Sequence, residues 1–297
     1  MVMGGVLFQW IVAEPTFQAT AIVSTAGARA WRARLAAILW ISLALAVISG
    51  VAWLLALAAR IGAQGPSAGV VWVLLTETRF GHLWIARAAL ALSLFCAFLP
   101  GKAGDGGKRP AQGLIVVTAL CLMGSLAGSG HAAGTPGALG DVHLVADVLH
   151  LLAAAAWLGG LLPLSLLFGM ALRQTDPSLA AALPVATRRF STLGLLSVGT
   201  LLATGLVNTC MVAGSLPALA HTGYGGLLLL KVALFAVIVA IASINRLRLM
   251  PELPRADTVR RLNRNARIEV ALGFAIIAIV SVLGTLSPGA HLGTQIR

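Results

Sequence analysis

Seven long apolar runs alternate with short polar connections along the chain. Each run consists mainly of Leu, Ala, Val, Ile and Gly. At about 1.5 Å per helical residue, each is long enough to cross a hydrocarbon core roughly 30 Å thick. The pattern therefore predicts seven transmembrane helices, at residues 35–58, 80–99, 112–129, 143–172, 190–213, 224–247 and 268–286.

A shorter apolar run opens the chain. Residues 2–13 are largely apolar, but Glu14 and Pro15 follow directly, and about 12 helical residues cannot cross such a core. Two interpretations are open: the segment continues past Pro15 to about Val23 as a kinked helix, or the given sequence omits part of the first span. We favour the second, with residues 1–23 as a truncated first span, which brings the total to eight.

The composition agrees with this pattern. Hydrophobic residues make up 59% of the 297-residue chain, only 10% of residues are charged, and the mean hydropathy is +0.94, whereas soluble domains contain about 25% charged residues. Only helices and closed barrels satisfy their backbone polar groups in lipid, and the run lengths suit helices rather than the roughly 10-residue strands of a barrel. We predict an all-α fold, a polytopic transmembrane helical bundle of about eight spans that forms a single domain over residues 1–297.

The net charge of +12 resides mostly in the connections between spans. A charge of this size can indicate nucleic-acid binding, but Lys and Arg in short loops beside apolar spans act as topology signals, so no nucleic-acid partner is predicted. The positive-inside rule places four basic connections in the cytoplasm and both chain termini on the periplasmic side. The basic residues of these connections are Arg29, Arg32 and Arg34; Lys102, Lys108 and Arg109; Arg173, Arg188 and Arg189; and Arg246, Arg248, Arg255, Arg260, Arg261, Arg264 and Arg267.

With this orientation, every histidine of the chain falls on the periplasmic side. Independent placement would rarely give so one-sided a distribution, which argues against histidines scattered through the core. The six are His82, His131, His143, His150, His221 and His291.

Three ionisable residues share one face of the run at 143–172. His143, Asp147 and His150 occupy positions i, i+4 and i+7, which lie on one side of a helix, and Trp157 continues the stripe. Ionisable residues within a span are expected to face the bundle interior or a wet cavity, and they mark functional sites.

The two histidines of this stripe are about 10 Å apart along the helix axis, too far to bind one metal ion at the usual distance of about 2 Å. Either they are successive sites of a relay, or each is joined by histidines from elsewhere, for which His131, His82 and His291 are the candidates. Asp147 can be a ligand or can orient an imidazole.

Charged residues inside the bundle need partners. Arg87 and Lys231 lie about two turns into their spans from the periplasmic side, at a depth similar to that of Asp147. We expect Asp147 to form an ion pair with one of them, in a structural or a gating role.

Four residues of two spans are candidate soft metal ligands. Cys121 and Met123 lie in one span, and Cys210 and Met211 at the periplasmic end of another. Thiolate and thioether groups suit Cu(I), but residues one or two positions apart on a helix face different ways. We therefore favour ordinary packing for all four over ligation.

The stretch "HLVADVLHLLAAAAWLGGLLPL" (143–164) resembles the histidine-bearing helix of the copper-resistance D family (CopD/PcoD). Three further segments agree with it: "LLTETRFGHLWIARAALAL" (74–92), "RRFSTLGLLSVGTLLATGLVNT" (188–209) and "YGGLLLLKVALFAVIVAIASINRLRL" (224–249). The resemblance extends over about residues 35–290.

The resemblance implies a multi-pass protein of the bacterial inner membrane that handles copper. Family members are implicated in moving copper ions from periplasm to cytoplasm, often beside a periplasmic copper-binding partner of the CopC type. Carried over to this chain, the resemblance implies that His143 and His150 are copper ligands.

Two other functions remain open. Histidines on facing helices can hold haem, as in a b-type membrane cytochrome, and a copper-binding scaffold or assembly protein would bind the ion without net transport. The chain has no GxxxxGK[ST] motif, so transport would be passive, ion-coupled or driven by transfer between proteins. We predict a copper transporter rather than an enzyme.

Overall fold

The computed structural model describes residues 1–62, 65–99, 109–129, 137–173, 178–213 and 222–286. Every regular element in these ranges is helical, so the all-α prediction is confirmed for them. The elements are α1 (Val2–Phe8), η1 (Gln9–Ala13), α2 (Glu14–Ala19), α3 (Ala26–Ile61), α4 (Ala68–Glu77), α5 (Arg79–Phe98), α6 (Arg109–Gly124), η2 (Ser125–Ser129), α7 (Gly137–Leu172), α8 (Ser178–Ala213), α10 (Gly223–Ile244), η4 (Asn245–Leu249), η5 (Met250–Glu252) and α11 (Ala256–Leu283).

All seven predicted spans are helices, and seven helices among the described residues are long and apolar enough to cross a membrane. Several extend well beyond their apolar part. α3, α7 and α8 have 36 residues each, a length of about 54 Å, so each of them projects beyond the hydrocarbon core.

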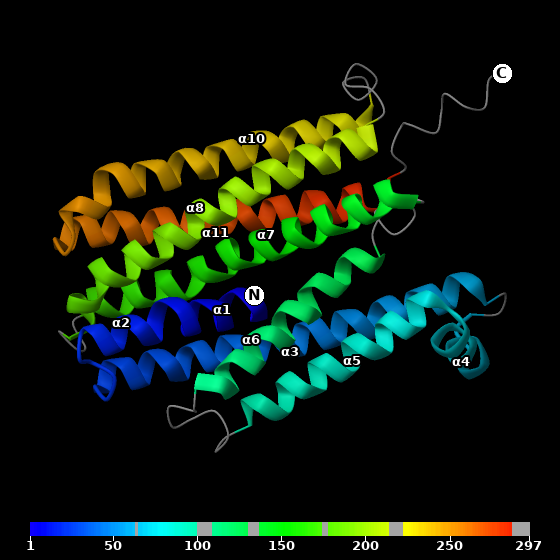
Figure 1. Cartoon of the computed structure of the whole chain (residues 1–297), viewed down its shortest axis with the longest axis horizontal. Coiled ribbons are helices and arrows are strands. Elements are labelled where there is room, and N and C mark those ends of the chain that lie inside the picture. The colour runs from blue at the N-terminus through cyan, green and yellow to red at the C-terminus, as the bar shows by residue number, and fades with distance from the viewer. Residues whose placement is uncertain (63–64, 100–108, 130–136, 174–177, 214–221, 287–297) are drawn as a thin grey trace.

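In three of the four predicted basic connections, some of the arginines lie inside these helical extensions. Arg29, Arg32 and Arg34 lie inside α3, Arg188 and Arg189 inside α8, and Arg260, Arg261, Arg264 and Arg267 inside α11. Hydropathy identifies only the part of a helix that lies in lipid, which is why the sequence predicted loops here. These arginines gather at one end of the bundle, which we call the basic end; it lies at the left of Figure 1.

The N-terminal segment is one helical run with a π-helical turn in its middle. α1, η1 and α2 follow without a break from Val2 to Ala19, through Pro15 in the first turn of α2. The run corresponds to the kinked-helix interpretation, although it ends before Val23. Its residues Phe8, Val12 and Phe17 are almost completely buried, so the segment belongs to the core of the protein.

Figure 1 shows two groups of helices with this N-terminal segment between them. α3, α5 and α6 pack together on one side, and α7, α8, α10 and α11 on the other, while α1 contacts α3, α6 and α7. The outward faces of α3, α8 and α10 are apolar and exposed, as helices in contact with lipid require.

Two glycines let the N-terminal segment meet α7 at backbone distance. A Cβ atom on Gly4 would lie 2.6 Å from Cα of Gly159 and 2.0 Å from the carbonyl oxygen of Ala155. Small residues allow such approach between membrane helices. One turn further along α7, the carbonyl oxygen of Pro163 accepts a hydrogen bond from Nε1 of Trp31 in α3.

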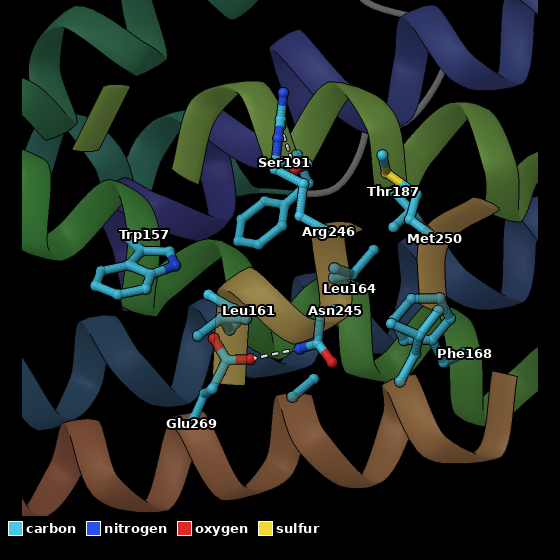
Figure 2. A pocket seen from close by; sticks show the side chains of 14 residues that line it. Trp157, Leu161, Leu164, Phe168, Thr187, Ser191, Asn245, Arg246, Met250 and Glu269 are labelled. Atoms are coloured by element: carbon cyan, nitrogen blue, oxygen red, sulfur yellow. Dashed lines mark hydrogen bonds between the residues drawn. The ribbon is translucent and has the colours of Figure 1, made fainter. Parts of the chain in front are cut away.

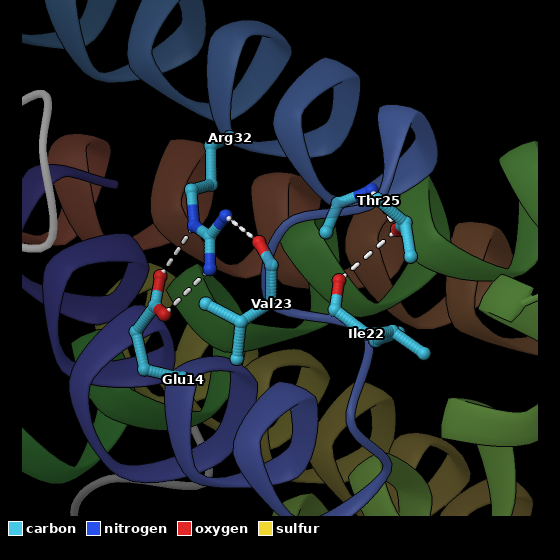
Figure 3. Close-up of polar contacts among 6 residues, drawn as sticks. Glu14, Ile22, Val23, Thr25 and Arg32 are labelled. Atoms are coloured by element: carbon cyan, nitrogen blue, oxygen red, sulfur yellow. Dashed lines mark hydrogen bonds and ion pairs between the residues drawn. The ribbon is translucent and has the colours of Figure 1, made fainter.

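A bidentate ion pair closes the connection between α2 and α3. Nε of Arg32 donates to Oε1 of Glu14 at 2.7 Å, and Nη2 donates to Oε2 at 2.8 Å (Figure 3). Nη1 donates to the carbonyl oxygen of Val23. The guanidinium also lies over the ring of Phe17. Glu14, which interrupts the apolar pattern at the N-terminus, is thereby satisfied inside the fold.

The sequence missed the short helix α4. It lies beside α5 at the end of the bundle opposite the basic end (Figure 1), with Trp72 and Val73 exposed. Its 10 residues are too few to span lipid, which is why they were read as part of a connection.

The contact between Gly4 and Gly159 generates a stability prediction. Gly4→Ala places a methyl group into the backbone of α7, and overpacking of this kind destabilises by about 1–3 kcal/mol. Gly199→Ala on α8 is the matched control, because nothing lies within 4 Å of its added Cβ. Thermal unfolding in detergent should show a lower Tm for Gly4→Ala and an unchanged or higher Tm for Gly199→Ala. Equal Tm values for the two variants would contradict the close contact.

Candidate functional site

The polar stripe of α7 lies in the half of the bundle opposite the basic end. His143 is buried, with 4% of its surface exposed, and Asp147 and His150 are half-buried. The stripe faces α8 and α10 rather than lipid, because residues of both helices contact or approach it. We call His143, Asp147 and His150 together with Thr204 and Lys231 the outer site.

A hydrogen bond to α8 fixes the imidazole of His150. Nδ1 lies 2.9 Å from Oγ1 of Thr204, and the hydroxyl of Thr204 donates its one proton to the carbonyl oxygen of Thr200 at 2.6 Å. Oγ1 of Thr204 must therefore accept the hydrogen bond from Nδ1–H. This tautomer leaves the lone pair of Nε2 free, which is the state that a metal-binding histidine requires.

Lys231 of α10 supplies the positive charge of the outer site. It lies within electrostatic range of both Asp147 and His150. Of the two cations considered for Asp147, Lys231 is therefore the one that the bundle brings near it. Gly205, next to Thr204 on α8, lies against the imidazole of His150, since a Cβ atom there would be 3.5 Å from Cε1.

Arg87 is engaged in a different set of contacts. Its guanidinium donates to the hydroxyl groups of Ser125 and Ser129 and to the carbonyl oxygen of Ser125, and it lies 5.8 Å from the ring centre of Trp53. These bonds tie α5 to η2, so Arg87 stabilises the N-terminal group of helices.

In the part of the chain that the structure describes, no further candidate histidine joins the outer site. His82 is exposed at the start of α5, where Nε2 lies 2.9 Å from the carbonyl oxygen of Thr76. His131, His221 and His291 fall outside the described residues. Within the described ranges, no group of three or more His, Cys, Asp or Glu side chains could hold a metal ion.

Three of the four candidate soft ligands are exposed. Cys121 and Cys210 are exposed on the outside of the bundle, and Met211 is also exposed. Met123 is partly buried and packs against the hydrophobic core.

A second polar site, which the sequence analysis did not find, lies in the half of the bundle nearer the basic end. Figure 2 shows a cavity that extends from Trp157 at one side to Phe168 and Met250 at the other. Glu269 of α11 points into it and is 2% exposed. The sequence signal was present, because Glu269 is an acidic residue inside an otherwise apolar span.

Trp157 separates the two polar sites. It lies on α7 between His150 and the cavity, packs edge-on against Phe235 of α10 at 5.9 Å between ring centres, and rests its indole against Gly194 of α8. The stripe of α7 thus runs from the outer histidines, past one aromatic side chain, to the cavity.

Comparison with known proteins identifies the family. A family model described as copper resistance protein D-like, N-terminal domain, matches residues 1–141, and one described as copper resistance protein D matches residues 184–283. The first covers the N-terminal segment and the helices α3 to α6, and the second covers α8, α10 and α11. No solved structure matches the chain significantly.

Three relatives match about three quarters of the chain. Inner membrane protein YebZ of Escherichia coli (strain K12) is 33% identical over 73% of this chain and 72% of its own length. Copper transport protein CutJ of Bacillus subtilis (strain 168) is 34% identical over 73% of this chain, which spans only 39% of that longer protein. Copper resistance protein D of Pseudomonas syringae pv. tomato is 28% identical over 74% of this chain and 73% of its own length. The chain is therefore a multi-pass inner-membrane protein and belongs to the copper-resistance D family.

Proposed function

We propose that this protein moves copper ions from the periplasm towards the cytoplasm, and that the outer site receives the ion. The observation that carries the proposal is the geometry at His150, whose Nδ1–H is held by Thr204 while Nε2 keeps its lone pair. The names of two relatives, a copper transport protein and a copper resistance protein, support copper as the cargo.

The α7 stripe favours a relay over a single chelate. His143 and His150 are about 10 Å apart along the helix, so each holds the ion in turn, with other donors completing each site. His82, His131 and His291 are the proposed additional ligands, together with Asp147. A periplasmic copper-binding protein of the CopC type is the proposed donor, since the histidines lie on the periplasmic side of the predicted topology.

Lys231 gives the outer site a means of balancing charge. With the site empty, Asp147 and Lys231 compensate each other inside the bundle. An arriving copper cation competes with Lys231 for Asp147, so this pair is suited to gating the step from His143 to His150.

Copper uptake into vesicles containing the purified protein tests the relay. His143→Ala and His150→Ala should each lower the uptake rate by at least about tenfold, the lower end of the loss seen when the support of a metal site is removed. Leu149→Ala is the matched control, because Leu149 is next to His150 but points outward and is 45% exposed.

Two outcomes would contradict the proposal. If His143→Ala and His150→Ala transport like the wild type, the outer site is not on the copper path. If the wild type binds copper without accumulating it, the protein is a scaffold, and a Soret band stoichiometric with the purified protein would identify a haem protein instead.

The hydrogen bond from His150 to Thr204 generates a second prediction. Thr204→Val removes the acceptor of Nδ1–H while keeping the side-chain volume, and loss of such an orienting partner weakens metal binding by about 10–100-fold. Thr204→Ser restores the hydroxyl and should bind copper like the wild type. Competition titration with a chelator measures the dissociation constant for copper of each variant. Equal values for Thr204→Val and Thr204→Ser would show that Thr204 does not orient the imidazole of His150.

A further inference from the structure

The cavity beyond Trp157 is lined by residues of α7, α8, α10, η4, η5 and α11, and the proposed copper relay does not use it. Its volume of about 60 Å³ is enough for a few water molecules. Apolar side chains of α7 form one wall, and the polar groups come from α8, η4 and α11 (Figure 2).

Glu269 is the acidic group of this cavity, and none of the cations that the structure describes is paired with it. Its Oε1 accepts a hydrogen bond of 2.8 Å from Nδ2 of Asn245, whose own Oδ1 accepts one of 2.7 Å from Asn265. Across the described residues, no Lys or Arg nitrogen lies within 4 Å of the carboxyl oxygens. A buried carboxylate without a paired cation is costly, so the site favours either a proton on the carboxyl group or a bound cation.

Glu14 shows the contrasting arrangement in the same chain. Both of its carboxyl oxygens contact the guanidinium of Arg32. Glu269 has an amide where Glu14 has a guanidinium, so within the described residues no contacting cation balances a negative charge on Glu269.

A second observation points to a ligand in the cavity. Oγ1 of Thr187 is buried in the cavity wall and has no hydrogen-bond partner among the described residues, and Thr187 is only 7% exposed. Buried hydroxyl groups are normally paired. A hydroxyl left open beside a polar cavity indicates a bound water molecule or ion.

The backbone at the cavity is also irregular. Asn245 and Arg246 begin the π-helical segment η4, where α10 departs from regular α-helix, and such segments occur frequently at functional sites.

Arg246 is the one other charged residue among the described residues that line the cavity, since α7, α8 and α11 contribute no further charge there. Its guanidinium donates to Oγ of Ser191 on α8 rather than to Glu269.

We propose that this cavity is a proton-binding site in which the carboxyl group of Glu269 exchanges its proton for the transported cation. The proton leaves to a water molecule of the cavity when the cation arrives, and it returns when the cation departs. With a monovalent cation such as Cu(I), the site is then neutral in both states.

The exchange part of this inference rests on the proposed copper transport, whereas proton binding does not. The chain contains no nucleotide-binding motif, and a proton site in the path would give transport an ion-coupled driving force. The cavity borders Trp157, which follows His150 along the α7 stripe, so Glu269 comes after His150 on the proposed copper path.

Infrared spectroscopy of the full-length protein in lipid tests proton binding directly. The wild type should show the carbonyl stretch of a protonated carboxyl group that is absent in Glu269→Gln and still present in Glu14→Gln. Glu269→Gln keeps a side-chain oxygen, Oε1, that can accept the hydrogen bond from Nδ2 of Asn245, so the fold should be retained. Raising the pH from about 5 to 10, across and above the ordinary carboxyl range, should convert this band to carboxylate. A band that survives in Glu269→Gln, or no such band at any pH, would overturn the inference.

Copper uptake at different lumenal pH values tests the exchange. Proton and copper cation compete for one carboxylate, so acidifying the side that receives copper should slow wild-type uptake by up to about tenfold per pH unit, the limiting slope for one titrating group. Glu269→Gln should transport at a rate independent of that pH. The same pH dependence in both proteins overturns the exchange, whereas failure of the wild type to accumulate copper overturns the proposed transport and leaves the infrared result intact.

Discussion

The backbone contact between Gly4 and Gly159 is the constraint around which the two groups of helices are arranged. A side chain at either position would hold the N-terminal segment away from α7, and α1 is the element that contacts α3, α6 and α7 together. The same approach brings Trp31 within reach of the carbonyl oxygen of Pro163. α7 is therefore fixed from the N-terminal side, and its opposite face is free to form the polar sites with α8, α10 and α11.

Both polar sites belong to the C-terminal group of helices, because they form on the face of α7 that is turned away from the N-terminal segment. His150 is oriented by α8 and lies near Lys231 of α10, and Trp157 of the same helix forms the boundary of the cavity that receives Glu269 of α11. The N-terminal helices use their buried charges differently. Arg32 neutralises Glu14 and Arg87 bonds to serines, which are contacts that stabilise the fold.

The apolar pattern was sufficient to predict the seven long helices, because the cost of burying backbone in lipid leaves few alternatives. It could not predict the helical extensions or α4, since the residues there lie outside the lipid or are too few to cross it. The spacing of His143, Asp147 and His150 correctly placed these residues on one helix. The sequence could not reveal the role of Thr204, because that role depends on a hydrogen bond to another helix. Glu269 carried a sequence signal as an acidic residue in an apolar span, but its partner Asn245 and its cavity are visible only in the fold.

On the proposed copper route, the two sites differ in how they balance the charge of the arriving cation. At the outer site Asp147 already has Lys231 nearby, so an arriving cation must displace a positive charge that cannot leave the protein. In the cavity, Glu269 accepts a hydrogen bond from the amide of Asn245, and within the described residues no cation contacts its carboxyl group. On the proposed route the charge that a cation displaces there is therefore a proton, which can leave, and the cation passes from His150 past Trp157 into the cavity. The opposite charges of Asp147 and Lys231 and the carboxyl group of Glu269 are complementary parts of that proposed route.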